Sequence, residues 1–167
     1  MILLQKESFD FCHILLKKAE TYAMNSNYHK AVTYNNMACY YRRVNKYRLS
    51  LTYLQNALAL EIKLDHPVSI ADTHLNLCAV LSHLGKHSEA LEHILMSIVL
   101  LQDEMMKGGN KKSQRISVLA IAYHNMGVEL EYLKRFDESI NAYKVNSNRF
   151  RKPWSSAKTT CPPRISW

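Results

Sequence analysis

The feature that constrains this chain most is a residue pattern that occurs four times. Each copy has an aromatic residue or His, a small residue three places later, a bulky residue four beyond that, and a small or polar residue three further on. The copies are Phe9-Cys12-Leu16-Ala19, Tyr47-Ser50-Leu54-Ala57, His87-Ala90-Ile94-Ser97 and Phe136-Ser139-Tyr143-Asn146. Spacings of three and four place residues on one face of a helix. The pattern therefore predicts one helical unit stacked on copies of itself.

A second helical pattern precedes each of the last three copies. Its members are Tyr34-Met37-Ala38-Tyr41, His74-Leu77-Cys78-Leu81 and Tyr123-Met126-Gly127-Leu130. The small third member, Ala38, Cys78 or Gly127, lets a neighbouring helix approach closely. The two patterns together indicate helical hairpins, in which a first and a second helix pack against each other.

These offsets resemble those of the tetratricopeptide repeat, whose consensus has a bulky residue, a Leu-Gly pair, a Tyr, an Ala, an aromatic residue and later a Pro. The closest segment is Thr73–Ser97, in which Leu84–Ala90 resembles the turn between the two helices of a repeat and the start of the second helix. The resemblance covers residues 6–146 and implies an all-α fold. That fold is a right-handed α-α superhelix of about seven helices.

The repeats are longer than the standard unit. We call the first residue of each copy its anchor: Phe9, Tyr47, His87 and Phe136. Successive anchors lie 38, 40 and 49 residues apart, whereas the standard repeat has about 34 residues. Lengthened repeats with the sequence of Asn35–Ala38 in the first helix, and with Asp-His-Pro before the next, are similar to those of kinesin light chains. This similarity concerns the style of the repeat and implies no association with kinesin.

The sequence divides into a helical array and a tail. The expected helices cover residues 6–24, 28–43, 47–63, 67–83, 87–106, 113–133 and 136–147. They form an array over residues 1–148, with units at 1–24 (partial), 28–63, 67–106 and 113–147. Residues 149–167 contain five basic and no acidic residues, include Pro and Ser, show no periodicity, and are expected to be disordered.

The first copy has no first-helix pattern before it, and the pattern decays after Tyr143. Phe9, Cys12, Leu16 and Ala19 would then pack against a helix lying before residue 1. We therefore expect a fragment or isoform of a longer repeat protein. The alternative is a complete short protein whose ends are covered by a partner or by self-association.

The net charge of +8 comes largely from the tail, because residues 1–148 contain 17 basic and 14 acidic residues. A repeat protein that reads RNA one base at a time needs a constant unit, whereas the spacing here varies from 38 to 49 residues. An RNA-binding helical repeat is therefore the least favoured function. Nucleic acid is not expected as a partner.

Signatures of catalysis and of metal binding are missing from the sequence. Gly108-Gly109 lacks the remaining residues of a phosphate-binding loop. His83 and His87 have the spacing of a metal pair, but Gly85 lies between them in the turn between two helices. We expect no enzymatic activity, no cofactor and no metal site.

The expected location is cytoplasmic, including assemblies of the cytoskeleton or the cilium. The most apolar stretch, Ile94–Leu101, has eight residues, whereas a membrane span needs about 20, so no membrane attachment is expected. The four cysteines make no close pair, which favours reduced thiols. Cys12 and Cys78 occupy packing positions for small residues and are expected to be buried.

The expected function is that of a non-catalytic scaffold or adaptor, which binds a peptide or helix of a partner protein in a concave groove. In the family that the chain resembles, first helices line most of this groove. The candidate groove residues are Asn35, Asn36, Arg43, Asn76, His83, His124, Asn125 and Tyr132. Hydrophobic ends of the array offer the alternative role of a structural subunit in a cytoskeletal or ciliary assembly.

Three of the candidate residues, Asn36, Asn76 and Asn125, recur at one offset in successive first helices. Each amide offers donors and an acceptor, so together they could hold the backbone of an extended peptide, while Arg43 would favour an acidic group. The alternative is that these amides form hydrogen bonds within the array and fix adjacent helices.

Overall fold

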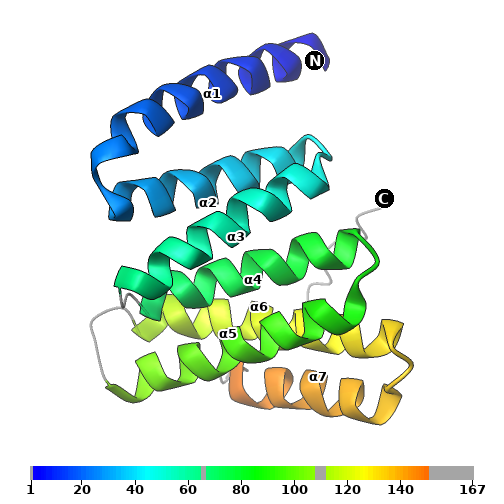
Figure 1. Ribbon diagram of the computed structural model, residues 1–167. Helices are drawn as coiled ribbons and strands as arrows, with labels where there is room; N and C mark the ends of the chain where they lie inside the picture. Colours follow the sequence, from blue (N-terminus) through cyan, green and yellow to red (C-terminus); the bar gives the residue numbers. More distant parts are fainter. Residues whose placement is uncertain (1, 65–66, 108–111, 151–167) are drawn as a thin grey trace, which may run out of the picture.

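A computed structural model describes residues 2–64, 67–107 and 112–150 (Figure 1). These residues form seven α-helices and one turn of 3-10 helix, with no strand. The elements are α1 (Ile2–Tyr22), η1 (Ala23–Asn25), α2 (Asn27–Arg43), α3 (Tyr47–Leu64), α4 (Pro67–His83), α5 (His87–Lys107), α6 (Lys112–Tyr132) and α7 (Phe136–Phe150). The predicted all-α fold is confirmed. Of the predicted tail, residues 149 and 150 belong to α7, and the rest lies outside the described residues.

The helices form antiparallel hairpins that stack along one direction (Figure 1). The closest packing is within the hairpins α2–α3, α4–α5 and α6–α7, and successive hairpins meet through α3–α4 and α5–α6. The first helices also contact one another, α2 with α4 and α4 with α6. They therefore form a continuous layer, along which residues from three hairpins can face one ligand.

The three hairpin turns have the same backbone geometry. Each contains one residue with positive φ, namely Asn45 at 60°, Gly85 at 72° and Lys134 at 60°. In each turn the following residue donates its backbone N–H to a carbonyl in the last turn of the preceding helix. These bonds are Lys46 to Tyr41, Lys86 to Leu81 and Arg135 to Leu130, at 2.8, 2.9 and 2.9 Å. Left-handed geometry of this kind ends many helices, and Gly adopts it most readily.

Replacing Lys134 with Gly is therefore expected to raise the free energy of unfolding by about 0.5–1 kcal/mol, because it removes the cost of a side chain at positive φ. Urea denaturation followed by circular dichroism measures the change. Lys144→Gly is the matched control: it lies within α7, where Gly should destabilise by about 1 kcal/mol. Loss of stability in Lys134→Gly as well would contradict the prediction.

The core consists of apolar side chains from the facing sides of the hairpins, together with small residues where the helices come closest. Large, fully buried members include Met37, Leu54, Leu77, Leu81, Ile94, Leu101, Leu119 and Leu130. Two buried hydroxyls lie at close approaches: Ser50 Oγ donates to the Ala38 carbonyl at 2.7 Å, and Ser97 Oγ to the Ala71 carbonyl at 2.8 Å. These bonds satisfy hydroxyls that would be costly to bury unpaired.

The close approach predicted for small residues is confirmed at Gly127 in α6. A Cβ atom added to this glycine would lie 2.5 Å from Cε1 and 2.6 Å from Cζ of Tyr143 in α7. That separation is far inside van der Waals contact, so the Tyr143 ring occupies the space that a side chain would need. In the hairpin α6–α7, the Tyr143 ring therefore packs directly on the backbone of α6 at Gly127.

The two thiols that were expected to be buried differ in the structure. Cys78 in α4 is fully buried, and burial raises the pKa of its thiol to about 12, so the thiol is held in its neutral, unreactive form. Cys12 in α1 is exposed, and the expectation is wrong there. Cys12 lines the open groove between α1 and α2, whereas its counterparts Ser50 and Ala90 are covered by the first helix of their own hairpin.

Candidate peptide-binding surface

Two of the candidate residues, Asn35 in α2 and Asn76 in α4, are hydrogen-bonded to each other. Asn76 Nδ2 donates to Asn35 Oδ1 at 2.8 Å, and Asn35 Nδ2 donates to Thr73 Oγ1 at 2.9 Å. Thr73 is fully buried, and both amides are half-buried. This chain of three side chains joins two successive first helices and holds the Asn76 amide in one orientation.

The residues at one offset, Asn36, Asn76 and Asn125, occupy different surroundings. Asn36 is exposed and lines a groove between α1 and α2. Asn125 is half-buried in α6. The side-chain link from α2 to α4 is made by Asn35, whereas the prediction had placed its neighbour Asn36 beside Asn76. Thr73 was missed by the sequence analysis, although it lies three residues before Asn76 and so on the same side of α4.

The candidates Arg43, His83 and Tyr132 occupy equivalent positions at the ends of the first helices. The His83 ring stacks on Tyr47 with centroids 4.7 Å apart, and the Tyr132 ring stacks on His87 at 4.1 Å. Each stack joins the end of a first helix to the anchor residue of the preceding second helix. Tyr132 still has 63% of its surface exposed. The rings of His83 and Tyr132 thus close two junctions between hairpins, and both residues remain exposed to solvent.

At the α1–α2 junction this stack is replaced by an open groove of about 520 Å³. Its lining consists of Ser8, Phe9, Cys12 and Leu16 from α1 and Asn36, Cys39, Tyr40 and Arg43 from α2. Arg43 and Phe9 are the counterparts of the stacked pairs elsewhere, and both line the groove. The contacts that do hold α1 to α2 include His13, whose ring stacks on Tyr40 at 5.2 Å and whose Nε2 lies 3.1 Å from the Tyr41 hydroxyl.

The third first helix, α6, contributes His124 and Asn125 in addition to Tyr132. His124 is exposed, and its ring lies 5.8 Å from that of Tyr143 in α7. The layer α2, α4, α6 therefore presents amide and ring side chains at its surface. No acidic residue is among the candidates.

A pair of histidines lies between α4 of this layer and the second helix α5: His74 in α4 and His93 in α5. Their Nδ1 atoms are 2.8 Å apart, and one must donate while the other accepts. Burial, together with the neighbouring His93, lowers the pKa of His74 to about 4. Burial also lowers the pKa of His93, against the opposite effect of Glu92 and Glu89. Both rings are therefore neutral at pH 7.

Contacts between buried or half-buried polar side chains connect helices of different hairpins. Arg115 of α6 binds Asp72 of α4 at 2.8 Å and Glu104 of α5 at 3.1 Å. Glu129 of α6 accepts from His87 Nδ1 at 2.8 Å and has 2% of its surface exposed. Burial raises the pKa of Glu104, and the Arg115 charge opposes that rise. Sequence reasoning missed these pairs because their members lie far apart in the chain.

The described part of the chain shows neither a metal-binding cluster nor a helix that could span a membrane. It contains no group of three or more His, Cys, Asp or Glu side chains that could hold a metal ion. His83 and His87 have different neighbours, Tyr47 for the first and Glu129 with Tyr132 for the second. None of the described helices combines the length and apolar character that crossing a membrane requires.

Comparison with known families places one hairpin unambiguously. The profile described as "Tetratricopeptide repeat" matches residues 30–67, which span α2 and α3. The chain carries a tetratricopeptide repeat. The other hairpins share the turn geometry of this repeat, and the α4–α5 hairpin also shares its junction stack, so the described chain has the fold of a tetratricopeptide array. The resemblance to the kinesin light chain type is not confirmed by this match.

Two solved structures resemble the chain along most of its length. The crystal structure of MamA protein has a TM-score of 0.64 and 16% identity, and the match covers 89% of this chain and 70% of that one. The crystal structure of BtubC (BKLC) from P. vanneervenii has a TM-score of 0.72 and 14% identity, covering 96% of this chain and 64% of that one. At such identities the likeness concerns the fold. No curated protein matches the sequence.

The Asn35–Asn76 link in this tetratricopeptide array leads to a prediction. Asn76→Ala is expected to lower the free energy of unfolding by about 1 kcal/mol, because it removes a side-chain hydrogen bond between two first helices. Asn125→Ala, which removes no bond found in the structure, should change it by less than about 0.5 kcal/mol. Urea denaturation of both variants measures the difference, and equal losses would contradict the prediction.

Proposed function

We propose that this chain is a non-catalytic protein-interaction scaffold, which binds a peptide or helix of a partner protein along the layer of first helices α2, α4 and α6. The observation that carries the proposal is the arrangement of Asn76, His124, Asn125 and Tyr132. These polar and aromatic side chains lie on consecutive first helices, and each is at least partly accessible to solvent. Amides can bind a peptide backbone through both donors and acceptors.

Rigidity supports this role. The Asn35–Asn76 bond, the ring stacks at the helix ends and the Arg115 ion pairs each connect different hairpins. A surface that is already ordered before binding loses little conformational entropy when a ligand binds. The protein's own contribution would therefore be positioning, without any chemical step.

Selection from a random phage-displayed peptide library tests this proposal directly. Peptides enriched on the wild-type protein should bind about tenfold more weakly to the variant Asn76→Ala/His124→Ala/Asn125→Ala. Thr52→Ala/Gln55→Ala/Asn56→Ala is the matched control, because it changes three exposed polar residues of the second helix α3. The proposal fails if no peptide is enriched, or if both variants bind as wild type does.

Exposed apolar residues on the outermost helices support a second candidate role, that of a structural subunit. Phe11, Ile14 and Leu15 of α1 are 63%, 64% and 50% exposed, and Phe136 of α7 is 59% exposed. Sedimentation velocity tests it: Phe11→Ser/Ile14→Ser should reduce any concentration-dependent association. A wild-type protein that stays monomeric at high concentration would argue against this role.

The proposed location is the reducing cytoplasm, including cytoskeletal or ciliary assemblies. Support comes from the three cysteines in the described part of the chain, which are all free thiols. Disulfides are rare in this compartment.

A further inference from the structure

The turn between α2 and α3 forms one corner of the array, and it differs from the equivalent turns between α4 and α5 and between α6 and α7. In the second and third hairpin turns, a basic residue before the anchor is paired with Glu three residues later: Lys86 with Glu89 at 2.9 Å, and Arg135 with Glu138 at 2.7 Å. At the first turn the basic residue Lys46 is present, but the position of the Glu is taken by Leu49, which is 40% exposed. The first corner therefore lacks its neutralising acid.

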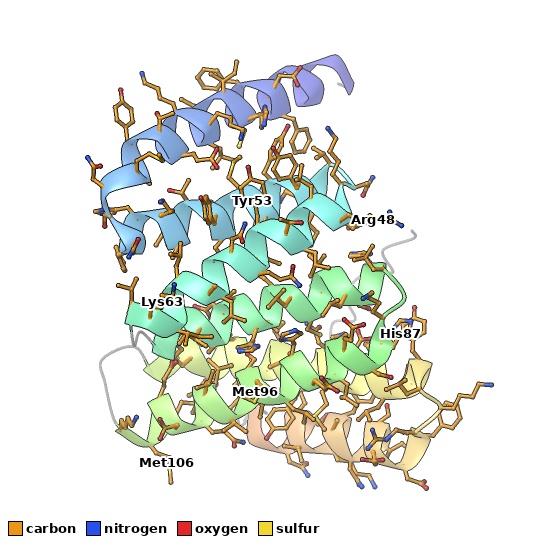
Figure 2. All side chains as sticks on the ribbon, viewed as in Figure 1. Arg48, Tyr53, Lys63, His87, Met96 and Met106 are labelled. Carbon is orange, nitrogen blue, oxygen red and sulfur yellow. The ribbon has the colours of Figure 1, made fainter. Side chains whose placement is uncertain are left out.

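Further cations surround this corner. Arg42 and Arg43 form the last turn of α2, and Arg48 follows Lys46 at the start of α3. Figure 2 shows Arg48 projecting at the edge of the array where His87 also lies, which is the edge formed by the hairpin turns. None of the four cations has an ion pair among the described residues.

The charge is uncompensated over a long stretch of chain, since residues 21–60 contain no Asp or Glu. From the neighbouring helix α1, Asp10 acts electrostatically on Tyr40, whose pKa is raised first by burial and then by the charge of Asp10. Among the described residues, the four cations together with Asp10 give this corner a net charge of about +3.

The charged corner is continuous with the groove between α1 and α2. Arg43 belongs to both, and the groove continues from it past Phe9 and Tyr40 to Leu16, with the polar side chains of Ser8 and Asn36 at its sides. Among the described side chains that line the groove, none is acidic. Apolar lining beside a guanidinium suits a ligand that places an apolar side chain next to carboxylates.

We propose that the α2–α3 corner, defined as Arg42, Arg43, Lys46 and Arg48, binds an acidic peptide segment together with the adjoining α1–α2 groove. The groove takes one apolar side chain of the peptide, and the corner binds two or more carboxylates. This proposal rests on the proposed scaffold function and extends its binding surface from the first helix α2 to the α2–α3 turn and to the groove against α1. It also names the chemistry of the partner segment.

An acidic peptide suits this site better than RNA or an anionic membrane, which also bind basic patches. Stacking of RNA bases needs free ring faces, but Tyr40 already packs against His13 at 5.2 Å and Tyr41 at 5.3 Å. An anionic membrane would need a broad apolar face beside the charges, whereas within residues 42–50, which carry the four cations, Leu49 is the one large apolar side chain that is exposed. Arginine, in contrast, binds carboxylates through two parallel hydrogen bonds.

Fluorescence anisotropy tests the proposal, with a labelled peptide of the sequence Gly-Glu-Glu-Leu-Leu-Glu-Glu-Gly as the probe. Arg43→Gln/Lys46→Gln/Arg48→Gln should weaken binding about tenfold. The control Lys18→Gln/Lys63→Gln/Lys144→Gln removes the same charge from exposed sites elsewhere and should bind within about twofold of wild type. A peptide with Ser in place of both Leu should also bind more weakly, because the groove then receives no apolar group.

Several results would overturn this assignment. They are absence of binding to wild type, equal weakening by both triple variants, and tighter corner-dependent binding of a 20-nucleotide poly-U RNA or of phosphatidylserine vesicles. The library-selected peptides separate this proposal from the one on which it rests. If they bind the corner variant normally but are lost with Asn76→Ala/His124→Ala/Asn125→Ala, the corner assignment fails and the scaffold function stands.

Discussion

Leu54→Ala is expected to lower the free energy of unfolding of the array by about 2–5 kcal/mol. Leu54 lies in α3 with 1% of its surface exposed, and it belongs to the continuous core formed by all three hairpins. Truncation removes three buried carbon atoms and leaves a cavity that the surrounding helices can close only in part. Circular dichroism during urea denaturation measures the loss.

The matched control for this variant is Leu49→Ala in the same helix. Leu49 is 40% exposed, so the same truncation should cost less than about 1 kcal/mol. Comparing the two separates burial from helix propensity, because Ala favours the helix equally at both sites. Equal effects of the two substitutions would mean that the packing around Leu54 contributes little.

The second large effect expected is a loss of stability as the pH falls from about 6.5 to about 4. In the unfolded chain His74 has the ordinary histidine pKa of 6.5, whereas in the folded protein its pKa is about 4. Between these values the unfolded state binds more protons, so acidification favours unfolding. The contribution of His74 is fully present above pH 6.5 and is lost progressively down to pH 4.

The expected size of this effect is about 3 kcal/mol, from a pKa difference of about 2.5 at 1.36 kcal/mol per unit. Thermal or urea denaturation at closely spaced pH values measures it. His74→Gln keeps a polar side chain but cannot titrate, and it should flatten the profile. His29→Gln, at an exposed position of α2, should leave the profile unchanged. A wild-type profile in His74→Gln would refute the assignment.

The helices could be predicted from sequence because their signals are local. The three-and-four spacing identifies buried faces, and Pro67 and Gly85 mark a helix start and a turn. The turn residues Asn45 and Lys134 carry a weaker signal than Gly85, yet all three adopt the same backbone geometry. There the packing of the hairpin determines the conformation, and residue type has a smaller effect.

The candidate surface was less predictable, because it depends on which side chains meet across helices. Equal offsets placed Asn36 and Asn76 together, whereas the structure joins Asn35 to Asn76. A neighbouring residue on a helix points about 100° away, so a small rotation of α2 relative to α4 decides which amide reaches across. The Asp72–Arg115 pair spans 43 positions, and no periodicity in the sequence connects its members.

The ring stacks described at the helix ends also bear on how the molecule would carry mechanical load. At two junctions a stack, Tyr47 on His83 and His87 on Tyr132, joins one hairpin to the next. Between α1 and α2 the corresponding residues, Phe9 and Arg43, border an open groove. A tensile force along the stacking direction would therefore separate α1 first, and the three hairpins behind it would stay together as one stiff block.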